Sequence, residues 1–322
     1  MHLLILGGTG FAGQALVRQL QGESAVVDVT VVSRTATSLP GVKRVLTGHY
    51  GDLVRAAEFR RQLAGVDAIV HLGDGLSILQ EPAHAADAAQ ADRLVASSEE
   101  IASTARDARV PLLVYVSSIK ALCDEEDDRV LVEASEPRGT TLYGRSKLRL
   151  EQAVTTALAG SATRLVVVRN PVMYGAGKAG SVHRLLKLVD TPFPLPLGGL
   201  ANKRSLLSVR NFASVLAAIA RAGPPSSSSV FHVHDGLALS TTEIVATLRD
   251  ALGRPRRLIP VGATAAYLAR QLPLMAPAAR RLYGSLEMSD AHFRRSFHWT
   301  PIVETKAALA EMARSFSGRT AS

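Results

Sequence analysis

Short apolar runs alternate with amphipathic stretches through the first half of the chain. The runs cover residues 3–6, 26–32, 68–72, 112–116 and 165–168, and the segments between them carry apolar residues at helical spacing. Strands that are apolar along their whole length are typical of a parallel sheet with helices on both faces. The pattern therefore predicts an α/β fold built on a doubly wound parallel sheet.

This alternation stops after Arg169, where segments rich in glycine and proline begin, among them residues 192–198. A length of 322 residues is enough for two structural units. We expect a sheet domain over residues 1–170 and a smaller C-terminal α/β lobe over residues 171–322, some segments of which return to the sheet domain.

Composition excludes several classes of protein. With 47% hydrophobic and 20% charged residues, the chain is typical of a globular enzyme and not of a fibrous or disordered protein. A single cysteine, Cys123, excludes an intrachain disulfide framework, and His232 and His234 have no further ligands at a suitable spacing, so we expect no metal site. No apolar run approaches the roughly 18 residues of a bilayer-spanning helix, and no secretory signal pattern opens the chain. We expect a cytoplasmic protein without an integral membrane segment.

The charge is basic and uneven. The chain carries a formal net charge of +9, of which +7 lies in residues 251–322. A nucleic-acid surface is one interpretation, but the basic residues are scattered and only 5% of the residues are aromatic, so stacking platforms are not expected. A phosphorylated small molecule is at least as good a partner, and solvated helix faces explain the charge without any partner.

A glycine-rich turn directly follows the first apolar run. Residues 7–13 read Gly-Gly-Thr-Gly-Phe-Ala-Gly, a G-x-x-G-x-x-G pattern that opens a helix running to about Gln21. Glycines allow a tight turn and a close approach to a pyrophosphate, while the N–H groups of the helix start attract its charge. Because the pattern stands between a strand and a helix, it predicts a dinucleotide-binding Rossmann domain over residues 1–170.

The end of the second expected strand bears on the choice of cofactor. An NAD-binding site usually offers an acidic residue there to the ribose 2′-hydroxyl, whereas this chain has Ser33 and Arg34. Arg34 could hold a 2′-phosphate. We therefore expect NADP as the cofactor, with NAD as the open alternative.

Tyr143 and Lys147 stand four residues apart in a segment expected to begin a helix, so their side chains share one face. A neighbouring ammonium stabilises a phenolate, which makes the phenol able to exchange a proton near neutral pH. The same lysine can hydrogen-bond a ribose. A tyrosine packed on the core beside a solvated lysine gives the same spacing without any chemistry.

A third polar group comes from the fifth expected strand, which ends at Ser117 and Ser118. Ser118 precedes Tyr143 by 25 positions. The glycine turn, a serine at the end of the fifth strand and a Tyr-x-x-x-Lys about 25 residues later resemble the extended short-chain dehydrogenase/reductase family of the NAD-dependent epimerase/dehydratase type. The likeness covers nearly the whole chain.

This resemblance implies roles for individual residues. Ser118, Tyr143 and Lys147 would be catalytic. The cofactor would be bound by residues of the turn, the strand ends and the helix, namely Gly7, Gly10, Phe11, Ala12, Gly13, Arg34, Asp52, Leu53, Leu72, Gly73, Lys147 and Pro171. The substrate would be bound by Ser118, Asn170, Ser181 and Arg204. Asp52 would accept a hydrogen bond from the adenine amino group.

Within the family, residues 117–120, 143–147, 195–198 and 203–206 are most similar to enzymes of nucleotide sugars used in polysaccharide biosynthesis. The resemblance implies a reductase of UDP-4-keto-6-deoxy-N-acetylhexosamines, with a UDP-hexose 4-epimerase as the alternative. Arg204 matches the arginine that these enzymes direct at the sugar-nucleotide pyrophosphate. Family members that dehydrate sugars carry Asp-Glu where this chain has Ile and Lys after Ser118, so dehydration is not expected.

Departures from the family pattern leave a second class of function open. Leu72, Gly73 and Asp74 stand where Ala-Ala is usual, Ser181 replaces an asparagine, and Arg210 replaces an aspartate. A non-catalytic NADP-binding regulatory or assembly protein is the resulting alternative. The presence of all three expected catalytic residues favours an enzyme, with a nucleotide sugar as substrate and no nucleic acid as partner. A homodimer is an open alternative to a monomer.

Overall fold

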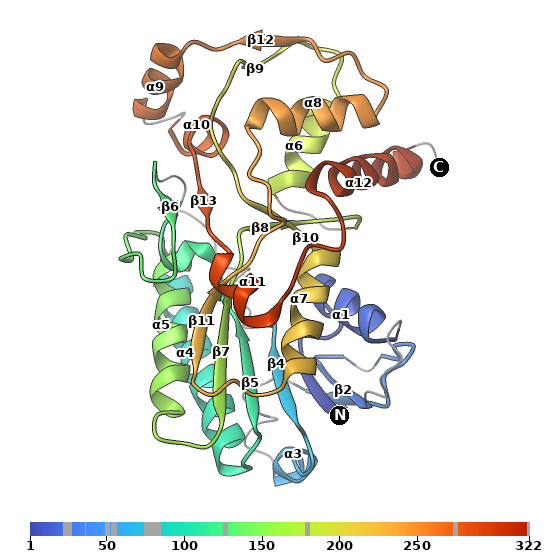
Figure 1. Ribbon diagram of the computed structural model, residues 1–322, viewed down its shortest axis with the longest axis vertical. Helices are drawn as coiled ribbons and strands as arrows, with labels where there is room; N and C mark the ends of the chain where they lie inside the picture. Colours follow the sequence, from blue (N-terminus) through green and yellow to red (C-terminus); the bar gives the residue numbers. More distant parts are fainter. Residues whose placement is uncertain are drawn as a thin grey trace.

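In the computed structural model the chain forms a large sheet domain with a smaller lobe at the carboxyl ends of its strands (Figure 1). The structure describes residues 1–21, 28–35, 37–48, 52, 57–73, 85–124, 128–177, 181–272 and 276–320. Leu53 and Asp74, which the sequence singled out, lie outside the described residues.

A seven-stranded parallel sheet forms the main domain, in the order β11-β7-β5-β4-β1-β2-β3. Its strands are β1 (His2–Leu6), β2 (Asp28–Ser33), β3 (Arg44–Thr47), β4 (Ala68–His71), β5 (Leu112–Val116), β7 (Arg164–Arg169) and β11 (Ser229–His232). The four residues of β4 and the five of β5 are all buried, as expected for strands covered on both faces. The predicted fold class, a doubly wound parallel sheet, is confirmed.

Helices cover both faces of this sheet (Figure 1). On one face α1 (Phe11–Gln21) packs beside α7 (Val209–Ala222), and on the other α4 (Ala85–Asp107) packs beside α5 (Leu142–Ala157). The side chains of alternate strand positions divide into two hydrophobic clusters, one for each face. A short helix, α3 (Ala57–Gln62), adds to the cluster on the α4 and α5 face.

Further elements build the smaller lobe. They are the helices α6 (Ser181–Val189), α8 (Thr241–Ala251), α9 (Ala263–Gln271), α10 (Ala276–Tyr283) and α12 (Thr305–Thr320) and the paired strands β9 (Leu195–Gly198) and β12 (Leu258–Pro260). Most of them share a third hydrophobic cluster, separate from the two that cover the sheet. The helix α8 begins with a capping box in which Ser240 and Glu243 satisfy each other's backbone N–H groups.

Short strand pairs connect the lobe to the sheet domain. They are β8 (Val172–Tyr174) with β10 (Leu206–Ser208), and β6 (Val130–Leu131) with β13 (Glu287–Met288). Three elements of the C-terminal half, α7, β11 and α11 (Ala291–Phe297), pack on the main sheet. The boundary at residue 170 stays a prediction, and these returning elements show which segments of 171–322 belong with the sheet.

Among the described residues, no helix has both the length and the apolar character that crossing a membrane requires.

Candidate active site

The glycine turn joins β1 to α1 at the carboxyl edge of the sheet. Gly7 has a φ of 86°, a conformation that favours glycine, and its carbonyl accepts the N–H of Gly10 at 3.0 Å. At Gly13 a Cβ would lie 2.4 Å from both the carbonyl oxygen of Gly7 and the Cα of Gly8, so the helix rests directly on the turn. The first turn of α1 contains no acidic residue, and the positive end of a helix dipole suits a bound phosphate.

A Gly13→Ala substitution is therefore expected to displace α1 from the turn, destabilise the fold by about 1–3 kcal/mol and weaken dinucleotide binding. Gly262→Ala is the matched control, because a Cβ at Gly262 meets nothing within 4 Å. Chemical denaturation and titration with NADPH measure the two effects. Wild-type affinity and stability in Gly13→Ala would show that the turn does not need this contact.

Three further expected cofactor residues, Leu72, Gly73 and Arg34, lie at neighbouring strand ends. Leu72 and Gly73 follow β4 and are half-buried, and Leu72 N donates to Leu6 O at 3.0 Å, which places them beside the glycine turn. Arg34 follows β2 and is exposed, as is Asp52. The ends of β4 and β2, which Leu72, Gly73 and Arg34 follow, lie at the carboxyl edge, where a parallel sheet binds a dinucleotide.

Ser118 and the pair Tyr143 and Lys147 come together beyond the end of β5. Ser118 caps a short 3-10 helix, η2 (Ile119–Ala121), and its Oγ accepts the N–H of Lys120 at 3.2 Å. Tyr143 and Lys147 lie on the first turns of α5. The buried Lys147 Nζ donates to the carbonyl of Val116 at 3.1 Å and lies 5.9 Å from the centre of the Tyr143 ring. The ammonium is thus held within reach of both the phenol and the end of β5.

A cavity of about 820 Å³ opens between this group and the smaller lobe. Several expected site residues line it, namely Ser118, Tyr143, Asn170, Pro171, Ser181 and Arg204. Lys147 is not among the described residues that line the cavity. The residues of the glycine turn are not among them either. The structure therefore brings the expected catalytic and substrate-binding side chains to one place, with the expected cofactor turn at the adjacent strand ends.

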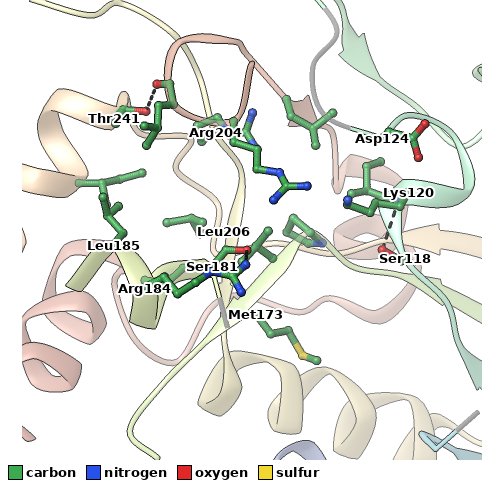
Figure 2. A pocket seen from close by; sticks show the side chains of 18 of the residues that line it. Ser118, Lys120, Asp124, Met173, Ser181, Arg184, Leu185, Arg204, Leu206 and Thr241 are labelled. Carbon is green, nitrogen blue, oxygen red and sulfur yellow. Dashed lines mark hydrogen bonds between the residues drawn. The ribbon is translucent and has the colours of Figure 1, made fainter. Parts of the chain in front are cut away.

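Arg204 enters the cavity from the smaller lobe. Its backbone N–H donates to Leu239 O at 2.9 Å, and its Nη1 donates to Gly284 O at 3.3 Å. Figure 2 shows the guanidinium extending across the cavity toward Lys120 and Ser118. Such a fork suits the oxygens of a phosphate.

Asn170 offers a hydrogen-bond acceptor to a ligand. Its Nδ2 donates to Pro171 O at 2.8 Å, and its backbone oxygen accepts the N–H of Ile119 at 2.9 Å, which ties the η2 turn to the end of β7. The buried Oδ1 has no hydrogen-bond partner among the described residues. Because a buried acceptor without a partner is costly, a donor group of a bound ligand is its natural partner.

Ser181 lines the cavity from the smaller lobe, at the start of α6. It is exposed and accepts a hydrogen bond from Arg184 at 3.4 Å. Arg184, Lys120 and Arg281 are cavity residues to which sequence reasoning gave no role. With Arg204 they face one carboxylate, that of Asp124, among the described lining residues. The cavity is therefore basic, and it suits an anionic ligand.

A buried ion pair joins α5 to the end of β7, beside the expected catalytic residues. Arg169, the last residue of β7, donates to Glu151 of α5 through Nε at 3.0 Å and Nη2 at 2.6 Å, and both side chains are 7% exposed. Ser117 Oγ also donates to the Glu151 carboxylate. Since Glu151 follows Lys147 by one helical turn, this network fixes α5 against the ends of β5 and β7.

The two histidines considered for a metal site have other environments. His232 ends β11 and is fully buried, and its pKa is lowered to about 3 because burial, and then the charge of Arg169, disfavour its cationic form. His234 lies beyond the strand, where its Nδ1 accepts the N–H of Gly236 at 2.9 Å and its Nε2 lies 3.4 Å from Asp290. The two histidines therefore have different surroundings, one without a polar partner for its ring among the described residues and the other between Gly236 and Asp290.

Comparisons with known proteins identify the family. The model of the NAD dependent epimerase/dehydratase family matches residues 3–231. A UDP-glucose 4-epimerase from Vibrio cholerae is 27% identical over 98% of this chain and 95% of its own length. A dTDP-6-deoxy-L-talose 4-dehydrogenase (NAD(P)(+)) from Kitasatospora kifunensis is 25% identical over 81% of this chain and 82% of its own. The structure of a UDP-N-acetylglucosamine 4-epimerase from Bacillus cereus matches with a TM-score of 0.74 at 19% identity, over 97% of this chain and 98% of that one.

A doubly wound parallel sheet with a glycine-rich turn after its first strand is an architecture that binds dinucleotides. The chain belongs to the NAD dependent epimerase/dehydratase family. This membership confirms the expected family and a nicotinamide dinucleotide as the class of cofactor. The roles of the individual site residues and the preference for NADP stay predictions.

Proposed function

We propose that this enzyme reduces the C4 ketone of a nucleotide-linked 4-keto-6-deoxy sugar with NADPH. The observation that carries the proposal is that Ser118, Tyr143, Asn170 and Arg204 line the same cavity. The hydroxyls of Tyr143 and Ser118 suit proton transfer and hydrogen bonding to a carbonyl oxygen, and the guanidinium of Arg204 suits a diphosphate. The name of the Kitasatospora kifunensis relative also describes redox chemistry at C4 of a nucleotide-linked 6-deoxy sugar.

When bound, the nicotinamide cofactor would supply the hydride that the carbonyl carbon gains. Tyr143 donates its hydroxyl proton to the carbonyl oxygen as negative charge develops there, and Ser118 hydrogen-bonds the same oxygen. Lys147 stabilises the phenolate that remains on Tyr143 until a proton from solvent restores it. The carbon thus gains a hydride and the oxygen a proton, and an alcohol results.

The lining of the cavity supports the substrate class. Arg204 and the other cations suit the diphosphate, and holding it away from the reacting carbon lets its binding energy orient the sugar. More than half of the lining residues are apolar, among them Met173, Leu185 and Leu206. A sugar that lacks a hydroxyl leaves fewer polar groups unpaired against such walls than a fully hydroxylated hexose does.

For the cofactor, the exposed Arg34 beyond β2 favours NADPH over NADH. We expect Arg34→Ala to reduce this preference, because it removes the positive charge that would meet the 2′-phosphate. Arg18→Ala, at an exposed position on α1, is the matched control. Titration of each variant with both cofactors measures the preference. Equal affinities in the wild type, or an unchanged preference in Arg34→Ala, would assign Arg34 to the solvated surface.

The second candidate is a UDP-hexose 4-epimerase, which the near full-length match to the Vibrio cholerae enzyme favours. Both reactions use the same catalytic residues. An epimerase oxidises C4, lets the keto sugar rotate and returns the hydride to the other face, so it retains its cofactor. A reductase must release the oxidised cofactor in every turnover.

One experiment separates these functions. The purified full chain is first examined by absorbance for bound dinucleotide and then given UDP-4-keto-6-deoxy-N-acetylglucosamine with NADPH. We expect stoichiometric loss of the reduced cofactor and formation of a 4-hydroxy sugar. Retained NAD with interconversion of UDP-hexoses and no cofactor loss would establish the epimerase instead. Binding of NADPH without either reaction would favour a regulatory or assembly protein.

A further inference from the structure

The segment that follows Ser118 is fastened to the start of α5 by one carboxylate. Asp124 lies six positions after Ser118, at the cavity rim beside Lys120 (Figure 2). Its Oδ2 accepts the backbone N–H groups of Thr140 and Thr141, the latter at 3.1 Å, and the Thr140 hydroxyl at 3.2 Å. Its Oδ1 accepts the hydroxyl of Thr141. Four donors from two adjacent residues thus converge on one side chain.

Thr141 connects the Asp124 carboxylate to the first turn of α5. It is the N-cap residue of α5, and its Oγ1 accepts the N–H of Gly144 at 3.0 Å while donating to Asp124. Tyr143 lies between these two residues, within the first turn. The carboxylate therefore acts on the turn of the helix that carries the phenol.

The backbone at the start of α5 packs closely against the segment that follows Ser118. A Cβ at Gly144 would lie 2.5 Å from the carbonyl oxygen of Lys120 and 2.7 Å from Oδ1 of Asp124. The start of α5 therefore rests directly on the η2 turn, which Ser118 caps. The positions of Ser118 and Tyr143 relative to each other depend on this contact and on the hydrogen bonds that hold it.

We infer that Asp124 is a positioning residue of the reaction, which sets the distance and angle between the Tyr143 and Ser118 hydroxyls through the cap of α5. The inference rests on the proposed function, in which both hydroxyls address one carbonyl oxygen. Misplacing such a group by about 1 Å can cost on the order of 10²-fold in rate.

Asp124 also lines the cavity, so a direct role as an acid has to be weighed. Burial favours its neutral form, but hydrogen bonds from Thr141 and Thr140 outweigh burial and lower the pKa of Asp124 below its ordinary value. The group remains an ionised acceptor near neutral pH. Its four donors engage both oxygens, which supports positioning over proton donation.

Asp124→Ala tests the inference, with Asp92→Ala on the exposed face of α4 as the matched control. We expect kcat to fall about 10- to 100-fold in Asp124→Ala with KM and NADPH affinity nearly unchanged. Asp124→Asn, which retains an acceptor oxygen, is expected to recover most of the rate. A rise in KM with unchanged kcat would overturn the inference and assign Asp124 to substrate binding.

A double-mutant cycle with Tyr143→Phe gives the sharper result. If Asp124 acts through Tyr143, adding Asp124→Ala to Tyr143→Phe costs little further rate, because the hydroxyl it positions is already gone. An equal loss in both backgrounds would overturn the inference. Thr141→Val removes the hydroxyl that donates to Asp124, so it is expected to lower kcat by a similar factor. Its effect on kcat is expected not to add to that of Asp124→Ala. The variant also tests the inference if Asp124→Ala folds poorly.

Hydrogen exchange keeps this test separate from the identity of the substrate. In the full chain without ligand, Asp124→Ala is expected to speed amide exchange in the first turn of α5, including Gly144, whereas Asp92→Ala is not. A wild type that turns over no nucleotide sugar would defeat the proposed function alone. Unchanged exchange at this turn in Asp124→Ala would defeat the positioning role, whatever the substrate.

Discussion

Tyr143→Phe is expected to lose about 10²–10⁴-fold in turnover while NADPH affinity is unchanged. The substitution removes only the hydroxyl that donates the proton. The ring keeps its contacts with the hydrophobic cluster on the α4 and α5 face and its place beside the Lys147 ammonium. Steady-state kinetics with the keto sugar, together with cofactor titration, measure both quantities.

Tyr267→Phe is the matched control, because it makes the same change at an exposed position on α9. It is expected to leave kcat and stability at the wild-type level. A Tyr143→Phe enzyme within a few-fold of wild type would contradict the mechanism. In that case the proton comes from another group, and the arrangement at the end of β5 has no catalytic role.

Much of the sheet could be predicted because its strands are apolar on both faces. The run at residues 112–116 coincides with β5, and the runs at 3–6, 68–72 and 165–168 differ from their strands by one residue at one or both ends. At β7 the hydrogen-bonded ladder extends beyond the apolar run to Arg169. Hydrophobicity could not show this end, since Arg169 is buried by its ion pair with Glu151 and not by an apolar side chain.

The return of the C-terminal half to the sheet could be anticipated only in general terms. The strand β11 pairs with β7, more than 50 positions earlier in the chain, and α7 packs against α1. Similarly, β9 forms across Pro196 by pairing with β12. Each pairing depends on a partner remote in sequence, which the local pattern of apolar and polar residues does not specify.

The distance in sequence between contacting residues also explains which site residues could be predicted. Ser118, Tyr143 and Lys147 belong to local motifs with a fixed spacing, and the structure places them together. Asp124 and Glu151 carry no such signal, because their partners lie 17 and 18 positions away, at Thr141 and Arg169. A carboxylate in a run of acidic residues is usually a solvated group, and only the fold shows that Asp124 is not.

Arg169→Met is expected to lower the free energy of unfolding by about 3–5 kcal/mol. It leaves the Glu151 carboxylate buried beside Ser117 without its cation, and desolvating an unpaired charge is costly. Arg149→Met is the matched control, since the Arg149 and Asp92 pair is 2.8 Å long but about half exposed, and such pairs contribute roughly 0–1 kcal/mol. Chemical denaturation of both variants measures the difference.

Replacing both partners distinguishes an unpaired charge from lost packing. In the double variant Glu151→Leu with Arg169→Met, no charge remains buried, so most of the lost stability is expected to return. Its turnover is expected to stay below wild type, because Ser117, next to Ser118, has lost the carboxylate that anchors it to α5. A loss of stability in Arg169→Met no larger than that in Arg149→Met would contradict this expectation. It would mean that water reaches the Glu151 carboxylate once its partner is removed.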